Sequence, residues 1–82
     1  MTKILYFGRL SDLTGTSEEL LDIPANIETA GQLRSWLDRR FDADGALLEQ
    51  TIRIAIDSEI IFDTALLGSA EEIALMPPVG GG

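Results

Sequence analysis

The sequence predicts a two-layer α+β fold, in which one main helix packs on one face of a mixed sheet of about five strands. Five short stretches have the alternating apolar pattern of strands, and one longer stretch has a helical pattern that opens with a capping signal. Their order along the chain is strand, strand, helix, strand, short strand, strand. A length of 82 residues suits one domain with a modest core.

The first part of the chain predicts two strands joined by a helical turn. Residues 3–7 alternate as a strand, and residues 8–15 can hold one helical turn that Gly15 ends. A second strand covers residues 17–23 and stops before a proline. We expect these two strands to pair antiparallel over the short connection.

The clearest helix begins at Thr29. The sequence Thr29-Ala30-Gly31-Gln32 matches a capping box, in which a threonine is followed three residues later by glutamine. One helical face then carries Leu33, Trp36, Leu37 and Phe41. This spacing favours a core position for Trp36, with a surface anchor as the alternative. The polar positions, which we expect to be largely solvated, are Arg34, Asp38, Arg39 and Arg40.

The second half predicts the remaining strands. A helical turn is expected over residues 46–50, and the strongest strand signal covers residues 51–57, where three isoleucines alternate with other residues. A short strand at residues 60–62 and a loop at 63–70 follow, and the last strand, residues 72–76, can lie beside the first. Proline at position 77 ends it. We therefore divide the chain into a domain, residues 1–76, and a C-terminal tail, residues 77–82.

The composition excludes several classes of site. The chain has neither cysteine nor histidine, so disulfides, thiolate metal sites and the commonest general base are absent. Six basic residues against fourteen acidic give a net charge of −8, which argues against nucleic-acid binding. This charge suits a basic partner surface, although solubility alone is a sufficient reason for it. No apolar stretch is long enough for a membrane helix, and no export signal precedes the first strand, so we expect a cytoplasmic protein.

The acidic pairs do not have the pattern of a catalytic or metal site. Glu18-Glu19, Asp42 with Asp44, and Glu71-Glu72 lack a metal-loop spacing, and we expect them to be solvated. No glycine-rich loop forms a phosphate cradle. The sequence therefore predicts a protein that is not an enzyme by itself and that binds no metal or cofactor of its own.

The C-terminus is the candidate functional segment. Pro77 and Pro78 stiffen its base, and Val79 is followed by Gly80-Gly81-Gly82. We expect a thin arm whose reactive group is the carboxylate of Gly82, because nothing beyond Val79 carries a side chain. Six residues from Pro77 reach roughly 19–21 Å, enough to enter a buried partner site. The alternative is an inert, frayed terminus.

An apolar patch beside this arm is the candidate docking surface. Strand alternation sends Phe7 and Met76 to the face opposite Tyr6 and Leu75, and Ile60 can join them. If the helix covers the other face, these residues form an exposed partner-binding patch. The alternative is that they pack under the 63–70 loop.

The chain resembles the small subunit of molybdopterin synthase, of the MoaD type, within the ubiquitin-like β-grasp sulfur carriers. The resemblance covers the whole chain, and its specific part is Met76-Pro77-Pro78-Val79-Gly80-Gly81-Gly82. Weaker similarity lies at residues 3–8, 13–16, 29–33 and 54–57. Two departures are Met76, where the family often has an aromatic residue, and the third glycine at position 80.

The resemblance implies a sulfur carrier with a functional Gly81-Gly82 end. A MoeB-type adenylating enzyme would use ATP to activate Gly82, which then becomes a thiocarboxylate. A large MoaE-type subunit, which holds the catalytic residues, would receive the arm and pass the sulfur to cyclic pyranopterin monophosphate. Two alternatives stay open: a carrier for thiazole or tRNA thiolation, and a ubiquitin-like modifier joined to lysines.

Overall fold

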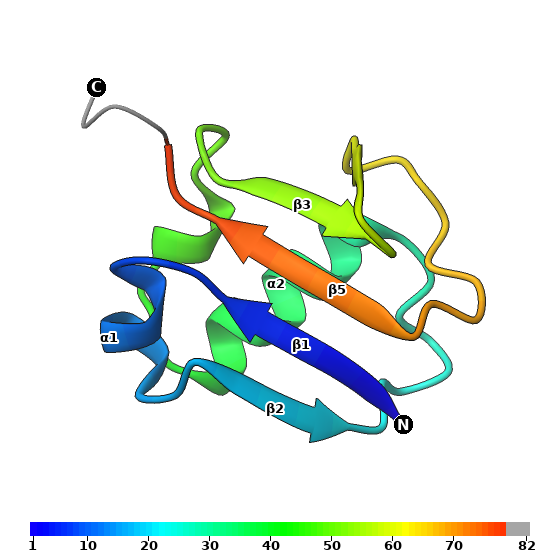
Figure 1. The fold of residues 1–82 in the computed structure, drawn as a ribbon, viewed down its shortest axis with the longest axis horizontal. Helices are drawn as coiled ribbons and strands as arrows, with labels where there is room; N and C mark the ends of the chain where they lie inside the picture. The colour runs from blue at the N-terminus through cyan, green and yellow to red at the C-terminus, as the bar shows by residue number, and fades with distance from the viewer. Residues whose placement is uncertain (79–82) are drawn as a thin grey trace.

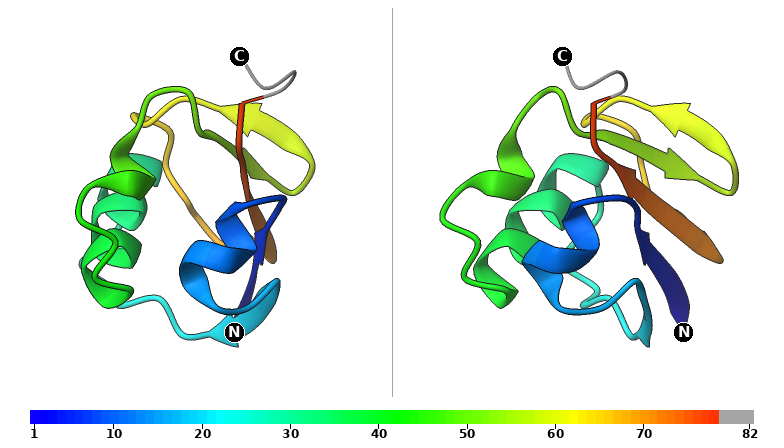
Figure 2. Two further views of the ribbon diagram at one scale, coloured as in Figure 1. Left: turned by 90° about the vertical axis from the view of Figure 1, so that its left-hand side faces the viewer. Right: turned by 60° about the vertical axis from the view of Figure 1, so that its left-hand side comes forward.

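The computed structural model describes residues 1–78 of the chain. Within these residues, five strands form one sheet in the order β2-β1-β5-β3-β4 (Figure 1). Their bounds are Thr2–Tyr6 (β1), Glu18–Leu21 (β2), Arg53–Ile56 (β3), Glu59–Ile61 (β4) and Glu72–Met76 (β5). The helices are α1 (Leu10–Thr14), α2 (Ala30–Arg40) and the 3₁₀ turn η1 (Ala46–Leu48). They lie on one side of the sheet, which confirms the predicted two-layer α+β class (Figure 2).

The centre of the sheet is a parallel pair. β1 and β5 run side by side with Ile4 opposite Ile73 and Tyr6 opposite Leu75, as expected for the first and last strands. β2 pairs antiparallel with β1, and β3 pairs antiparallel with both β5 and β4. Because β1 and β5 are parallel, their carboxyl ends leave the sheet at the same edge. This edge carries both the β1–α1 turn and the start of the C-terminal segment.

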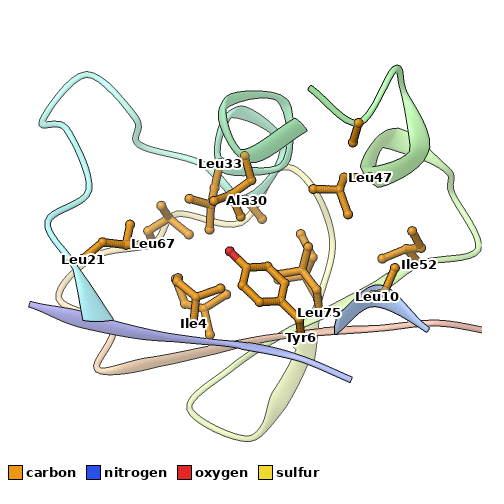
Figure 3. Packing of buried hydrophobic residues seen from close by; sticks show 14 residues of the cluster. Ile4, Tyr6, Leu10, Leu21, Ala30, Leu33, Leu47, Ile52, Leu67 and Leu75 are labelled. Carbon is orange, nitrogen blue, oxygen red and sulfur yellow. The ribbon is translucent and has the colours of Figure 1, made fainter. Parts of the chain in front are cut away.

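The core lies between the sheet and α2. Figure 3 shows Ile4, Tyr6 and Leu75 rising from the strands toward Ala30 and Leu33 of the helix. Tyr6, at 2% exposure, is the largest of the buried side chains. Seven further large side chains are 0–1% exposed: Ile4, Leu33, Leu37, Leu47, Ile54, Ile73 and Leu75. Leu10 and Ile52 lie at the end of the core from which the C-terminal segment leaves the sheet, and they are 3% and 4% exposed. Trp36 is only partly buried and packs against this cluster.

The backbone amides at the start of α2 donate hydrogen bonds to acceptors in two places, the capping box and the 63–70 loop. The Thr29 hydroxyl oxygen accepts from the Gln32 amide at 3.2 Å, and the Gln32 side-chain oxygen accepts from the Thr29 amide at 3.1 Å, which confirms the capping box. The next two helical amides donate to carbonyls of the 63–70 loop, at 2.9 Å each. Gly31 allows this approach, since a Cβ there would lie 3.2 Å from the Cβ of Asp63. The loop is thereby tied to the helix side of the sheet.

Two helix residues expected in solvent are buried, so that expectation was wrong. Arg34 is 6% exposed; it donates to the Glu49 carbonyl at 2.8 Å and pairs with Asp63 at 3.1 Å. Asp38 is 8% exposed and accepts from the amides of Gly45 and Leu47 at 2.9 and 3.0 Å. The reason is that η1 packs beside α2, and these side chains satisfy its backbone groups.

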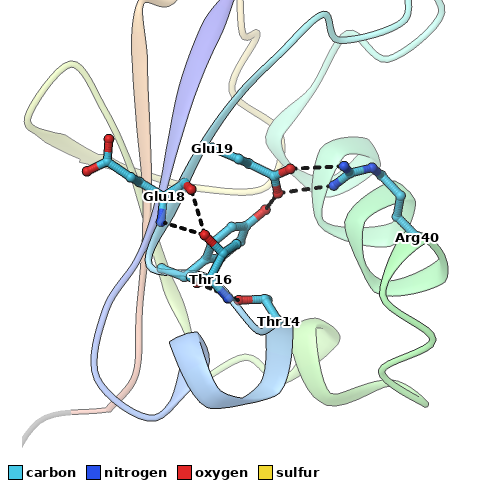
Figure 4. A network of polar contacts seen from close by, with 6 residues as sticks. Thr14, Thr16, Glu18, Glu19 and Arg40 are labelled. Carbon is cyan, nitrogen blue, oxygen red and sulfur yellow. Dashed lines mark hydrogen bonds and ion pairs between the residues drawn. The ribbon is translucent and has the colours of Figure 1, made fainter.

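Glu19 was also expected to be solvated and instead joins β2 to the core. Its carboxylate accepts from the Tyr6 hydroxyl at 2.7 Å and from both terminal nitrogens of Arg40 at 3.1 and 2.9 Å (Figure 4). Burial raises the pKa of Glu19, but the hydrogen bonds from Arg40 and Tyr6 outweigh it, and the pKa of this carboxyl lies below its usual value. Burial, and then the bond to Glu19, raise the pKa of Tyr6.

Neither a membrane span nor a metal cluster occurs in the described part of the chain. No helix among residues 1–78 is long and apolar enough to cross a bilayer. The same residues contain no group of three or more side chains that would hold a metal ion.

Candidate partner-docking site

The base of the C-terminal segment is fixed against the β1–α1 turn. The Phe7 amide donates to the Leu75 carbonyl at 3.1 Å, which extends the β1–β5 ladder by one bond. The next residue, Gly8, has a φ of +56°, and a Cβ there would lie 3.0 Å from Cγ of Pro77. Position 8 therefore favours glycine both for its backbone conformation and for the space that Pro77 occupies. The last four residues of the predicted tail, Val79, Gly80, Gly81 and Gly82, lie outside the described residues.

The face of the sheet that the helices leave uncovered is largely apolar. Its centre is formed by Leu5, Ala74 and Ala55, which lie opposite one another on β1, β5 and β3. Both alanines are small and buried, with Ala55 at 7% and Ala74 at 9% exposure. We call this surface the open face; its exposed large apolar side chains are Phe7, Leu20 and Ile60, with exposed fractions of 47%, 61% and 64%.

The structure places the three predicted interface residues as follows. Phe7 and Ile60 are exposed, and the 63–70 loop is tied to the helix side, so these two side chains do not pack beneath that loop. Met76 is half-buried at the end of β5 and lies opposite Arg53 of β3. Phe7 and Met76 are therefore close to the base of the tail, whereas Ile60 lies on β4, the edge strand beyond β3. Their role in binding stays a prediction.

Leu20 and Phe62 extend the apolar surface and were not predicted as interface residues. Leu20 pairs with Lys3 across the β1–β2 ladder, and the alternation of the second predicted strand could have placed it on this face. Phe62 follows β4 and is 81% exposed. The predicted strand at residues 60–62 places Phe62 two positions after Ile60, so its alternation could have indicated that both lie on the same face.

Charged side chains line the open face without forming a catalytic set. Lys3 lies opposite Glu72 on the neighbouring strand, and Arg53 lies opposite Met76. The shifted titratable groups Tyr6 and Glu19 belong to the network with Arg40 on the helix side, away from this face. In residues 1–78 the open face therefore has the properties of a binding surface.

The fold and the site together define a class of protein. A mixed sheet of order 2-1-5-3-4 with one main helix, whose central strand leads directly to the chain end, is the ubiquitin-like β-grasp arrangement. The chain is similar to SAMP1 from Haloferax volcanii, with a TM-score of 0.78 and 20% identity over 99% of this chain and 98% of that one. It is also similar to small archaeal modifier protein 1 from Methanosarcina acetivorans, with a TM-score of 0.70 and 26% identity over 99% and 95% of the two chains.

Sequence comparison specifies the family. Residues 4–82 match the ThiS family, and the chain belongs to it. A molybdopterin synthase sulfur carrier subunit from Caenorhabditis briggsae is 32% identical over 98% of this chain and 95% of its own length. The corresponding subunit from Arabidopsis thaliana is 29% identical over 98% of this chain and 81% of its own length. The resemblance inferred from the sequence is thereby confirmed, and a sulfur-carrier role is supported.

Proposed function

We propose that this chain is the sulfur-carrying small subunit of a molybdopterin synthase. The observation that carries the proposal is its similarity, over nearly its whole length, to sulfur carrier subunits of that enzyme. The C-terminal Gly81-Gly82 and the β5 strand that leads to it supply the chemical and structural parts of the argument. The chain has no catalytic set of its own in this proposal, and the large subunit performs the chemistry.

The proposed reaction uses the backbone carboxylate of Gly82. One of its oxygens attacks the α-phosphorus of ATP on a cytoplasmic adenylating enzyme, and pyrophosphate leaves. A sulfur donor then attacks the acyl carbon, AMP leaves, and a thiocarboxylate remains on Gly82. In the large subunit this sulfur is transferred to cyclic pyranopterin monophosphate, and water restores the carboxylate. Glycine at the last positions lets the chain end enter a narrow partner channel, because no side chain obstructs it.

The open face supplies the docking surface in this proposal. Phe7 and Met76 lie at the end of the sheet from which the tail leaves, and Ile60 lies on β4, the edge strand of the same face, so a partner that receives the tail and covers this face is brought against them. An apolar centre with charged residues at its edge is the usual anatomy of a protein interface. The net charge of −8 favours a partner with a basic surface and accelerates their encounter.

A protein-modifier role is the second candidate. It is favoured by the 26% identity to a small archaeal modifier protein, which covers 99% of this chain. Activation at Gly82 would be the same, but the acyl group would pass to a lysine amine of another protein instead of to sulfur. The two roles therefore differ in the nucleophile that displaces AMP.

An intact-mass experiment tests both roles. The chain is incubated with ATP, a purified adenylating enzyme and a sulfur donor, and reactions without ATP and with a Gly81–Gly82 deletion serve as controls. A mass gain equal to the replacement of one oxygen by sulfur, absent from both controls, is expected. A lysine-linked conjugate would favour the modifier role, and no change of either kind would contradict both. An N-terminal tag should be tolerated, whereas a C-terminal tag should abolish the gain.

A further inference from the structure

A groove on the helix side of the sheet lies beside the tail base and has no role in the proposal above. It is a hollow of about 600 Å³ between α1 and the segment from η1 to β3, with an apolar lining of Leu10, Leu13, Ala46 and Ile52. Leu10 and Ile52 belong to the core and form its floor, whereas Leu13 is 39% exposed. We call this hollow the α1 groove. A volume of this size is in the range of pockets that hold a ligand or a large side chain.

The position of the α1 groove relates it to the tail. Arg9, which lines the groove, directly follows Gly8, the residue against which Pro77 packs. α1 lies at the end of the sheet from which β5 leads to the C-terminus (Figure 1), and it belongs to the helix layer (Figure 2). The open face lies on the other side of the sheet. The tail base is therefore flanked by an apolar surface on each side.

The rim of the groove carries more negative than positive charge. Asp12 and Glu49 contribute two carboxylates, and Arg9 contributes one guanidinium. An apolar floor with a rim of net negative charge is complementary to an apolar side chain of a partner protein that has a lysine or arginine beside it.

We propose that the α1 groove is a second docking contact for the large subunit, occupied by one aliphatic or methionine side chain of that subunit beside a lysine or arginine. This inference rests on the proposed function and deepens it by specifying how the partner holds the carrier. α1 lies in the helix layer near the tail base and the open face lies on the other side of the sheet (Figure 1, Figure 2), so a partner that surrounded the tail base would contact both. Apolar side chains that fill such pockets commonly supply a large part of the binding free energy.

Two substitutions test this contact without removing a core residue. Leu13→Ser removes the exposed apolar wall, and Thr51→Trp fills the groove from an exposed position on its lining. Leu66→Ser is the matched control, because Leu66 is 73% exposed and lies in the 63–70 loop tied to the start of α2. The dissociation constant for the purified large subunit of the same organism is measured by calorimetry. We expect both groove variants to bind about tenfold or more weakly, and the control to stay within about twofold.

The outcomes separate this inference from the proposed function. Thermal unfolding of each variant identifies any loss of binding that follows from misfolding, and Thr51→Trp keeps the test decisive if Leu13→Ser is unstable. Unchanged affinity of a folded groove variant, with wild-type sulfur transfer intact, overturns the groove contact alone. Failure of the wild type to bind the large subunit overturns the proposed function as well. A change only in self-association, measured by sedimentation, would assign the groove to a second copy and also contradict the inference.

Discussion

Replacement of Phe7 by alanine is the most direct test of the open face. Phe7 is 47% exposed, and its amide, not its ring, makes the bond to the Leu75 carbonyl. A phenylalanine side chain offers roughly 200 Å² of surface, so about 95 Å² of this ring remains for a partner to cover. At about 25 cal/mol per Å², full coverage contributes about 2.4 kcal/mol, which corresponds to roughly a 50-fold change in affinity. Because alanine retains its Cβ, we expect a loss of about 10- to 50-fold.

The assay compares three proteins against the purified large subunit. Wild type, Phe7→Ala and Leu66→Ala are titrated by calorimetry, and the rate of thiocarboxylate formation is measured separately. Leu66 is the control because it is more exposed than Phe7 but belongs to the 63–70 loop. The stability of Phe7→Ala should fall by less than about 1 kcal/mol, since the ring is half-exposed. Equal affinity of Phe7→Ala and wild type would refute the assignment of the open face as the docking surface.

The remaining predictions concern the stability of the scaffold. Tyr6→Phe leaves Glu19 without one of its donors and should lower the free energy of unfolding by about 1–2 kcal/mol, measured in urea. The lowered pKa of Glu19 stabilises the fold above the unfolded value of about 4.5, so the advantage of wild type over Glu19→Gln should shrink as the pH falls below that value. An advantage that is independent of pH between 7 and about 3 would contradict this linkage. Thr29→Ala should cost about 1 kcal/mol through the lost cap, and an unchanged melting temperature would argue against it.

The order of the strands along the chain and the main helix could be predicted because their signals are local. The capping box fixes the start of α2 at Thr29, and period-two alternation marks the strands that bury Ile4 and Ile54. That the last strand can lie beside the first was also expected, and the structure pairs β5 with β1 in parallel. The direction and register of this pairing join residues about 70 positions apart, and no local signal specifies them.

The buried polar residues could not be predicted because their partners are distant in the sequence. Arg34 satisfies carbonyls at positions 47 and 49, and Glu19 meets Arg40 only after β2 and the end of α2 come together. A charged residue on the polar side of a helix gives the same sequence signal whether it faces water or a neighbouring 3₁₀ turn. Phe62 is the reverse case, since it follows Ile60 by two positions in the predicted 60–62 strand, and this local alternation could have placed it on the exposed face.

The parallel pairing of β1 and β5 determines where the C-terminal segment begins. It brings the β1–α1 turn to the point where β5 ends, and Pro77 is thereby packed against Gly8. The direction in which the C-terminal segment starts is therefore set by the core of the sheet, through Tyr6 and Leu75, and not by the segment itself. In the proposed function, a partner that recognised the open face would find the start of the tail at a fixed place, which would reduce the conformational entropy lost when the tail is bound. The proposed function has two separate requirements: a fixed base of the tail and a tail end without side chains. The pairing of the strands provides the first, and the C-terminal glycines provide the second.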